Sequence, residues 1–116
     1  AELLLQMQAE AERVFVHDVL YEYAANLVRA TRVHPMVELG MSPRGGLALV
    51  RMMKAAAYLK GKNYVTPKET EQVFVDVGIH RIRLGTKARM NHMTAREVLE
   101  EILRQVPRPL PKKKNG

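Results

Sequence analysis

The sequence predicts a mainly α fold, a small helical bundle of about four to five helices with at most very short strands. Apolar residues recur at intervals of three and four along most of the chain, which is the spacing of one face of a helix. Helix-capping residues precede several of these segments, and two of them show the Thr-x-x-Glu pattern of a capping box. Runs of β-branched and aromatic residues are too short to build more than very short strands.

Two helices are expected before the centre of the chain. Residues 1–13 have helical spacing but no capping residue in front, which suggests that the chain was cut from a longer one. Residues 14–16 favour a short strand. His17 or Asp18 then caps a helix that runs to about Val33 and ends at a His-Pro pair, because the residue before a proline avoids the helical region. The apolar face of this second helix comprises Leu20, Tyr23, Ala24, Leu27 and Thr31.

The third helix is expected from Pro43 to about Lys60. Ser42 satisfies the preference for the N-cap, and Pro43 that for the first helical position. This helix is apolar over most of its circumference, so we expect it to be the central buried helix. Gly61 is the predicted C-cap. One apolar side comprises Leu49, Met52, Met53, Ala56 and Leu59.

Two more helices are predicted in the second half of the chain. Residues 63–65 favour a second short strand. The capping box at residues 66–69 starts a helix that extends through His80. Residues 85–93 indicate a loop, and the capping box at residues 94–97 starts the last helix, which the next proline stops.

Length and composition restrict the protein class. A chain of 116 residues predicts one domain, which is small for an enzyme with its own cofactor fold. The absence of cysteine excludes disulfides and thiolate metal sites. Charged residues interrupt the apolar runs well short of a membrane span, and the N-terminal residues lack the basic flank of a signal peptide. We therefore expect a cytoplasmic protein.

The formal net charge of +7 is concentrated at the C-terminal end. Residues 107–116 contribute four positive charges, so residues 1–106 carry only +3. A short basic tail broken by prolines is expected to be disordered, and contact with a nucleic acid or an anionic surface is the alternative. The four charged residues are Arg108, Lys112, Lys113 and Lys114.

Arg44 is the charge that local physics disfavours. A helix N-terminus carries about half a positive charge, so a cation there costs some tenths of a kcal/mol unless an anion lies nearby. Unpaired N–H groups and a guanidinium together form an anion site, for which phosphate is the usual ligand. Two interpretations are open: Arg44 contacts an anion, with Ser42, Pro43 and Gly45 as the supporting helix N-terminus, or it is an exposed, solvated arginine.

A basic stripe continues from Arg44 along the same helix. Arg51 and Lys54 follow at intervals of seven and three residues, which aligns the three cations on one face. This face can lie against another domain or in solvent, and the residues favour neither.

Catalytic motifs are scarce. The histidines, His17, His34, His80 and His92, are scattered, with no pair four residues apart and no carboxylate at ligand spacing, so no metal site is expected. The chain contains neither a GxSxG nucleophile elbow nor a GxxxxGK[ST] phosphate loop. We do not expect this chain to catalyse a reaction alone.

Several segments follow one another in a specific order. They are Tyr23 to Arg32, His34-Pro35, Val37 to Arg44, Lys54-Ala55, Gly61 to Pro67 and His80-Arg81. In this order and at these distances they resemble the C-terminal lid of MoxR-type AAA+ ATPases. The resemblance covers roughly residues 1–106 and is specific because the blocks occur together.

The resemblance implies that Arg44 is the sensor-2 arginine of such a lid. In this family that residue reaches the γ-phosphate of ATP, which with Mg²⁺ is bound by a preceding AAA+ core domain in cis. The lid closes over the nucleotide and couples ATP hydrolysis to chaperone-like remodelling or complex assembly. The implied partners are neighbouring subunits of a ring, expected to be a hexamer, and von Willebrand A domain proteins.

This chain departs from the family pattern after the arginine. Gly45 and Gly46 stand where alanine usually follows, and they weaken the first turn by about 1 kcal/mol each. Close packing against a neighbouring backbone is favoured slightly over a functional hinge. Arg29, Arg32 and Arg81 are expected in structural ion pairs or interdomain contacts.

Two alternatives keep a helical domain but change its function. The first is a small basic nucleic-acid-binding module, against which stands the apolar character of the third helix. The second is the lid of another AAA+ clade, such as a magnesium-chelatase-like subunit, which keeps the role of Arg44 and changes the client.

Overall fold

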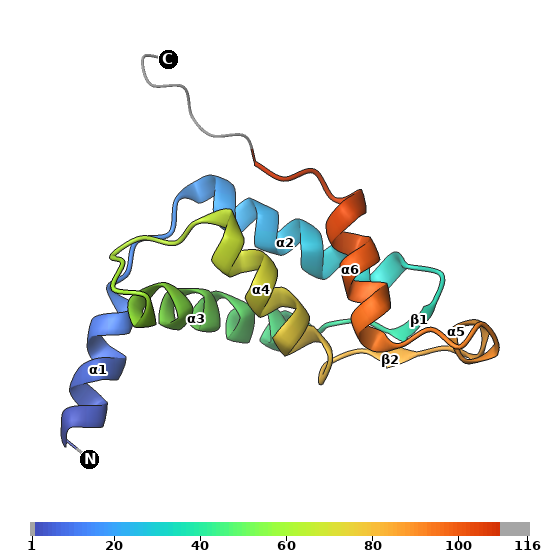
Figure 1. The fold of residues 1–116 in the computed structure, drawn as a ribbon, viewed down its shortest axis with the longest axis horizontal. Helices are drawn as coiled ribbons and strands as arrows, with labels where there is room; N and C mark the ends of the chain where they lie inside the picture. Colours follow the sequence, from blue (N-terminus) through green and yellow to red (C-terminus); the bar gives the residue numbers. More distant parts are fainter. Residues whose placement is uncertain (1, 110–116) are drawn as a thin grey trace.

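The computed structural model describes residues 2–109, which form a helical bundle with one small sheet (Figure 1). The predicted mainly α fold is confirmed. In chain order the elements are α1 (Glu2–Glu12), α2 (Asp18–Val33), β1 (Val37–Leu39), α3 (Pro43–Leu59), α4 (Pro67–Gly78), β2 (Arg83–Leu84), α5 (Thr86–Met90) and α6 (Ala95–Gln105).

The core lies where α2, α3, α4 and α6 meet. In Figure 1, α4 crosses α3, α2 packs against both of these helices, and α6 packs against α2 and α4. Large side chains from all four helices are almost completely excluded from solvent, and their burial is the main stabilising contribution to the fold. They include Tyr23, Leu27, Leu49, Met53, Phe74, Leu99 and Ile102.

Helix α3 is central, but it is less buried than the sequence indicated. Its buried positions are Gly45, Leu49, Met53 and Ala57, which are spaced by four residues and form a single stripe. Met52 and Leu59, expected on the buried side, are 48% and 76% exposed. The expectation of a central buried helix is therefore met along one stripe only, because the neighbouring helices cover one side of this apolar helix.

The two short strands predicted at residues 14–16 and 63–65 pair with each other through a single β-bridge. Phe15 pairs with Tyr64 in parallel orientation. The Phe15 N–H donates to the Asn63 carbonyl at 2.9 Å, and the Val65 N–H donates to the Phe15 carbonyl at 2.9 Å. Neither segment continues far enough to form a strand of its own.

The paired strands of the described chain lie elsewhere. β1 and β2 are antiparallel, with Val37 opposite Leu84 and Leu39 opposite Arg83. The predicted loop 85–93 contains the short helix α5, in which Ala88 is buried. These elements are too short for a hydrophobic period to reveal them.

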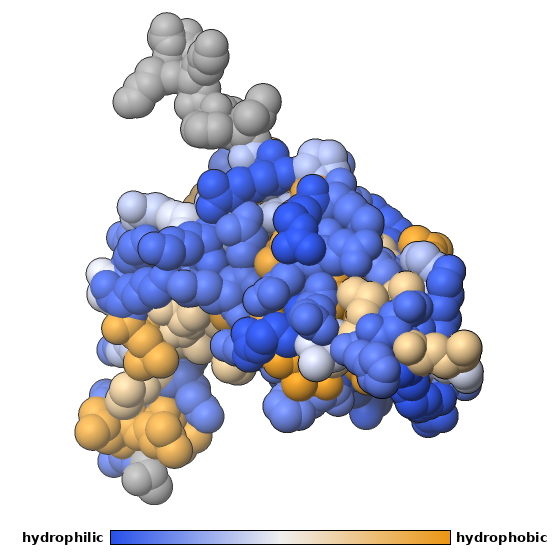
Figure 2. Space-filling model, turned by 45° about the vertical axis from the view of Figure 1, so that its right-hand side comes forward, coloured by the Kyte–Doolittle hydropathy of each residue, from blue (hydrophilic) through white to orange (hydrophobic). Residues whose placement is uncertain are grey.

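Helix α1 projects from the bundle and contacts mainly α3 (Figure 1). None of its described residues is buried. Figure 2 shows hydrophobic side chains gathered on this projection, where Leu3, Leu4, Leu5 and Met7 are exposed. No helix within residues 2–109 combines the length and the hydropathy needed to cross a bilayer.

The segment after α6 contacts the bundle through Arg108. Arg108 donates from Nε and Nη2 to the two carboxylate oxygens of Glu71, at 2.8 and 3.2 Å. The Tyr23 hydroxyl donates to the same carboxylate at 2.9 Å, and burial together with Glu71 raises the pKa of Tyr23. Of the predicted basic tail, Lys112, Lys113 and Lys114 lie outside the described residues.

Candidate functional site

The first turn of α3 has the predicted cap. The backbone of Ser42 is extended, and its Oγ accepts a hydrogen bond from the Gly45 N–H at 3.2 Å. The Gly46 N–H donates to the Ser42 carbonyl at 3.1 Å. Pro43 has no N–H to satisfy. Among the described residues, this leaves the Arg44 N–H as the first-turn donor without a partner.

Two residues before the cap fix the position of this turn against α2. The buried Met41 donates its N–H to Thr31 Oγ1 at 2.9 Å, and its carbonyl accepts from Arg32 Nε at 2.8 Å. A Cβ on Gly40 would lie 2.7 Å from both the Arg32 Cα and the Thr31 carbonyl oxygen. Only glycine permits this approach of the two backbones. The end of α2 therefore determines where α3 begins.

The Arg44 side chain is exposed at this rigidly placed turn. No hydrogen bond or ion pair joins it to another described residue, and the first turn of α3 contains no acidic residue. A cation in this position is unfavourable beside the positive end of the helix dipole. The turn is therefore suited to a contact with an external anion.

The two glycines that follow differ in their surroundings. Gly45 is buried, and a Cβ there would lie 3.3 Å from Arg81 Cδ and 3.4 Å from Met41 Cε. At Gly46 the nearest atom to a Cβ would be Val28 Cγ2 at 3.9 Å, which is an ordinary contact. The predicted close packing is therefore found at Gly45 and not at Gly46. At Gly45 the neighbours are side chains, and the close approach to a backbone occurs at Gly40 instead.

Two hollows lie beside the N-terminal half of α3. One, with a volume of about 260 Å³, lies between α2 and α3 and is lined in part by Arg29, Arg32, Pro43 and Gly46. The other, about 420 Å³, lies between α3 and α4 and is lined by Ala48, Arg51, Met52, Asp76, Val77, His80 and Arg81. Three of the latter residues are basic or histidine and one is acidic.

The basic stripe on α3 divides into two environments. Arg51 is exposed and lines the hollow toward α4. Lys54 is half-buried and donates to the Glu12 carbonyl at 3.2 Å, and one turn later Tyr58 donates to Glu10. Helix α1 thus covers the stripe beyond Arg51, and the structure does not place Lys54 in the surroundings of Arg44.

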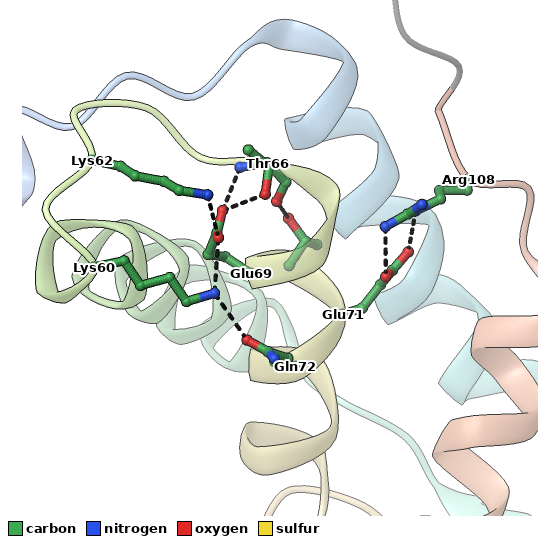
Figure 3. A network of polar contacts seen from close by, with 8 residues as sticks. Lys60, Lys62, Thr66, Glu69, Glu71, Gln72 and Arg108 are labelled. Carbon is green, nitrogen blue, oxygen red and sulfur yellow. Dashed lines mark hydrogen bonds and ion pairs between the residues drawn. The ribbon is translucent and has the colours of Figure 1, made fainter.

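Lysines at the other end of α3 are paired (Figure 3). Lys60 and Lys62 lie 3.0 and 3.2 Å from Oε2 of the fully buried Glu69. The Thr66 N–H and hydroxyl donate to the other carboxylate oxygen, each at 2.6 Å. Burial opposes ionisation of Glu69, but the hydrogen bonds from Thr66 and the lysines outweigh it and lower its pKa to about 2. Glu69 is thus the shared anion of both lysines, and the cluster keeps a net charge of +1.

The remaining arginines named by the sequence form no ion pair within the described part of the chain. Arg32 holds the Met41 carbonyl, and Arg29 donates to the Asn26 side chain. Arg81 packs along Gly45. Arg32 therefore has the expected structural role, but it acts through a hydrogen bond to a backbone carbonyl and not through an ion pair.

The histidines lie apart from one another. His17 caps α2 by accepting from the Val19 N–H at 3.1 Å. The buried His34 accepts from the Met36 N–H at 3.0 Å, and its Nε2 lies 3.5 Å from Glu101 Oε2. Within residues 2–109, no three His, Cys, Asp or Glu side chains form a group that could hold a metal ion.

Sequence reasoning missed two residues that shape this site. Thr31 was assigned only to the apolar face of α2, yet its hydroxyl anchors Met41 and donates to the Val28 carbonyl at 2.6 Å. Gly40 was part of a family block without a stated role. A polar residue on an apolar helix face and a glycine before a helix cap were the available signals.

Comparisons with known proteins agree with this geometry. The AAA lid domain family matches residues 29–102. The chain is 34% identical over 104 residues to the uncharacterized protein YeaC of Bacillus subtilis, which covers 90% of this chain and 32% of YeaC. It is 31% identical over 115 residues to chaperone MoxR1 of Mycobacterium tuberculosis, covering 91% of this chain and 30% of that protein.

A solved structure shares the fold. The crystal structure of a predicted ATPase from Cytophaga hutchinsonii superposes with a TM-score of 0.81 at 30% identity, over 88% of this chain and 34% of the other. The chain spans about a third of the length of these relatives. The family match favours a lid over a nucleic-acid-binding module, and the MoxR relatives favour MoxR over another AAA+ clade. The chain belongs to the AAA lid domain family and is the lid domain of a MoxR-like AAA+ ATPase.

Proposed function

We propose that this lid supplies the sensor-2 arginine, Arg44, to a nucleotide held by the core domain of the same protein. The observation that carries the proposal is the exposed Arg44 in a first turn that is rigidly placed, contains no acid and offers an unpaired N–H. A guanidinium and a helix N-terminus together suit the oxygens of an anion such as phosphate.

The residues of the turn fit a terminal phosphate. Arg44 is free to donate, Ser42 and Pro43 keep the turn formed, and Gly45 leaves room for the Arg81 and Met41 side chains beside the turn. ATP with Mg²⁺ would supply the phosphoryl group whose transfer to water drives the work of the protein. A charge-assisted contact from Arg44 is worth about 1.5 to 3 kcal/mol.

Lid movement follows from this contact. Arg44 favours the closed lid only while a phosphate lies within its reach, since a ligand shifts two states only by its differential affinity for them. Because Gly40 and Met41 join the turn to α2, displacement of Arg44 moves the bundle with it. In a ring of subunits, a hexamer in this proposal, such rotation changes contacts with neighbours and with client proteins, including von Willebrand A domain partners.

The further parts of the proposal concern the whole protein. The core domain in cis would hold ATP and Mg²⁺, the hydrolysis would drive chaperone-like remodelling or complex assembly, and the protein would act in the cytoplasm. Arg51, which is exposed on the same side of α3 as the hollow toward α4, is the remaining candidate for an interdomain face. Lys54, which is engaged with α1, is the weaker one.

An ATPase assay on the full-length protein that contains this lid tests the proposal. We expect Arg44→Ala to lower turnover at least tenfold, in line with the loss of about 1.5 to 3 kcal/mol. Arg96→Ala is the matched control, since Arg96 is an exposed arginine in the first turn of α6. Unchanged turnover in Arg44→Ala would contradict the proposal and would mean that Arg44 is an exposed, solvated arginine.

A further inference from the structure

The space beside Gly45 is filled by the side chains of Arg81 and Met41. If residue 45 had a Cβ, that atom would lie 3.3 Å from Arg81 Cδ, which is closer than most such contacts. Met41 shares this space, with its Cε at 3.4 Å and its Cβ at 3.6 Å from the same point. The aliphatic part of Arg81 therefore lies across the first turn of α3, directly beside the residue that follows Arg44.

The backbone of Arg81 is itself held in place. Its N–H donates to the Gly78 carbonyl at 2.9 Å, in the turn that ends α4. Gly78 packs under Leu99 of α6 so closely that a Cβ would lie 2.9 Å from the leucine methyl groups. The position of Arg81 is thus set by α4 and α6, while its side chain reaches α3.

The first turn of α3 is consequently fixed from two sides. On one side the α2 residues Thr31 and Arg32 bind the Met41 backbone. On the other side the Arg81 stem covers Gly45. Long basic side chains commonly stabilise a structure through their methylene groups while the charged end stays in solvent, and Arg81 as a whole is exposed.

We propose that Arg81 is a positioning residue for Arg44: its aliphatic stem holds the first turn of α3 against the end of α4 and so fixes the direction from which Arg44 approaches its anion. This inference rests on the proposed sensor-2 function. Misplacement of a contacting group by about 1 Å can reduce a rate a hundredfold, so loss of the stem is expected to be visible in turnover.

The alternative role for Arg81 is electrostatic. Its guanidinium would then contact the anion itself, as a second cation beside Arg44. The hollow that Arg81 lines is also lined by Arg51, His80 and Asp76. A charge effect of Arg81 would therefore add to the charges of these neighbours. Substitutions that keep the stem but differ in charge separate the two roles.

The test uses the full-length ATPase that contains this lid, with Arg81→Ala, Arg81→Met and Arg81→Lys, each alone and combined with Arg44→Ala. We expect Arg81→Ala to lower kcat about tenfold with KM little changed, while Arg81→Met and Arg81→Lys stay within about twofold of the parent, because both keep the stem. In the Arg44→Ala background, Arg81→Ala should cause no further loss, since the residue that it positions is gone.

Three results would overturn the inference while leaving the proposed function intact. The first is a full kcat for Arg81→Ala beside an impaired Arg44→Ala. The second is rescue by Arg81→Lys but not by Arg81→Met, which would assign the role to charge. The third is multiplication of the two losses in the double variant, which a merely structural role of Arg81 would produce. A silent Arg44→Ala would instead remove the proposed function and this inference together.

Discussion

The first turns of three helices have a cation at the same position but differ in the residue that follows it. A cation occupies the second helical position in each: Arg44 in α3, Lys68 in α4 and Arg96 in α6. In α4 and α6 the next residue is Glu69 or Glu97, whose carboxylate accepts the N–H of the capping threonine, at 2.6 and 2.8 Å. In α3 the next residue is a glycine.

This difference separates a structural helix start from a functional one. The glutamates of α4 and α6 place a negative charge in the first turn, which offsets both the helix dipole and the neighbouring cation. The first turn of α3 has no such charge, and Arg44 has no partner among the described residues. A cation at the second position is therefore ordinary, and α3 differs in having no first-turn carboxylate that would oppose the approach of an external anion.

The largest effect is expected from removing the buried glutamate of α4. Glu69→Ala should lower the free energy of unfolding by about 3 kcal/mol, because the Thr66 N–H loses its acceptor and Lys60 and Lys62 lose their shared anion. Glu97→Ala, in the exposed box of α6, should cost only about 1 kcal/mol. Urea denaturation of the parent and the two variants measures both values. Equal costs would mean that burial of Glu69 contributes nothing.

A pH dependence should follow from the same carboxyl group. The pKa of Glu69 is about 2 in the folded chain and 4.5 when unperturbed, so the unfolded state binds its proton first as the pH falls. The stabilisation is present above pH 4.5 and is lost between pH 4.5 and 2. We expect a loss of about 2 kcal/mol, reduced from the full shift because the partially exposed Lys60 and Lys62 are screened by water. Acid titration of stability for the parent and Glu69→Gln measures it, and parallel curves would contradict the assignment.

A smaller effect should distinguish the two glycines of the α3 turn. Gly46→Ala should stabilise the chain by about 0.5 to 1 kcal/mol, because the new Cβ meets only Val28 at an ordinary distance. Gly45→Ala gains the same helix propensity but crowds Arg81 and Met41, so its net effect should be near zero. Thermal unfolding of both variants makes the comparison. A larger gain for Gly45→Ala would show that its close contacts relax without cost.

The predictable parts of this structure are those that depend on neighbours in sequence. The Ser42 cap and the capping boxes at residues 66–69 and 94–97 form as predicted, because cap chemistry is local. The C-cap of α3 is Lys60 and not Gly61, but Gly61 follows it directly and takes the positive φ, 78°, that ends the helix. The predicted fold class follows from the same helix signals.

The parts that could not be predicted depend on contacts across the bundle. The pairing of β1 with β2 joins segments more than forty residues apart and leaves no hydrophobic period. The exposure of Met52 and Leu59 depends on which neighbours cover α3, and the Arg81 contact with Gly45 depends on how α4 ends. The anion expected at Arg44 is not part of this chain, so its local sequence could only indicate a need for it.

The affinity of the full-length protein for ATP and for ADP, measured by titration calorimetry with and without Arg44→Ala, tests the central claim most directly. Arg44 is proposed to contact the terminal phosphate, so the variant should bind ATP about tenfold or more weakly while its affinity for ADP changes little. Arg96→Ala should leave both affinities unchanged. Equal weakening for ATP and ADP, or no change for either, would contradict the assignment of Arg44 as the residue that detects the γ-phosphate.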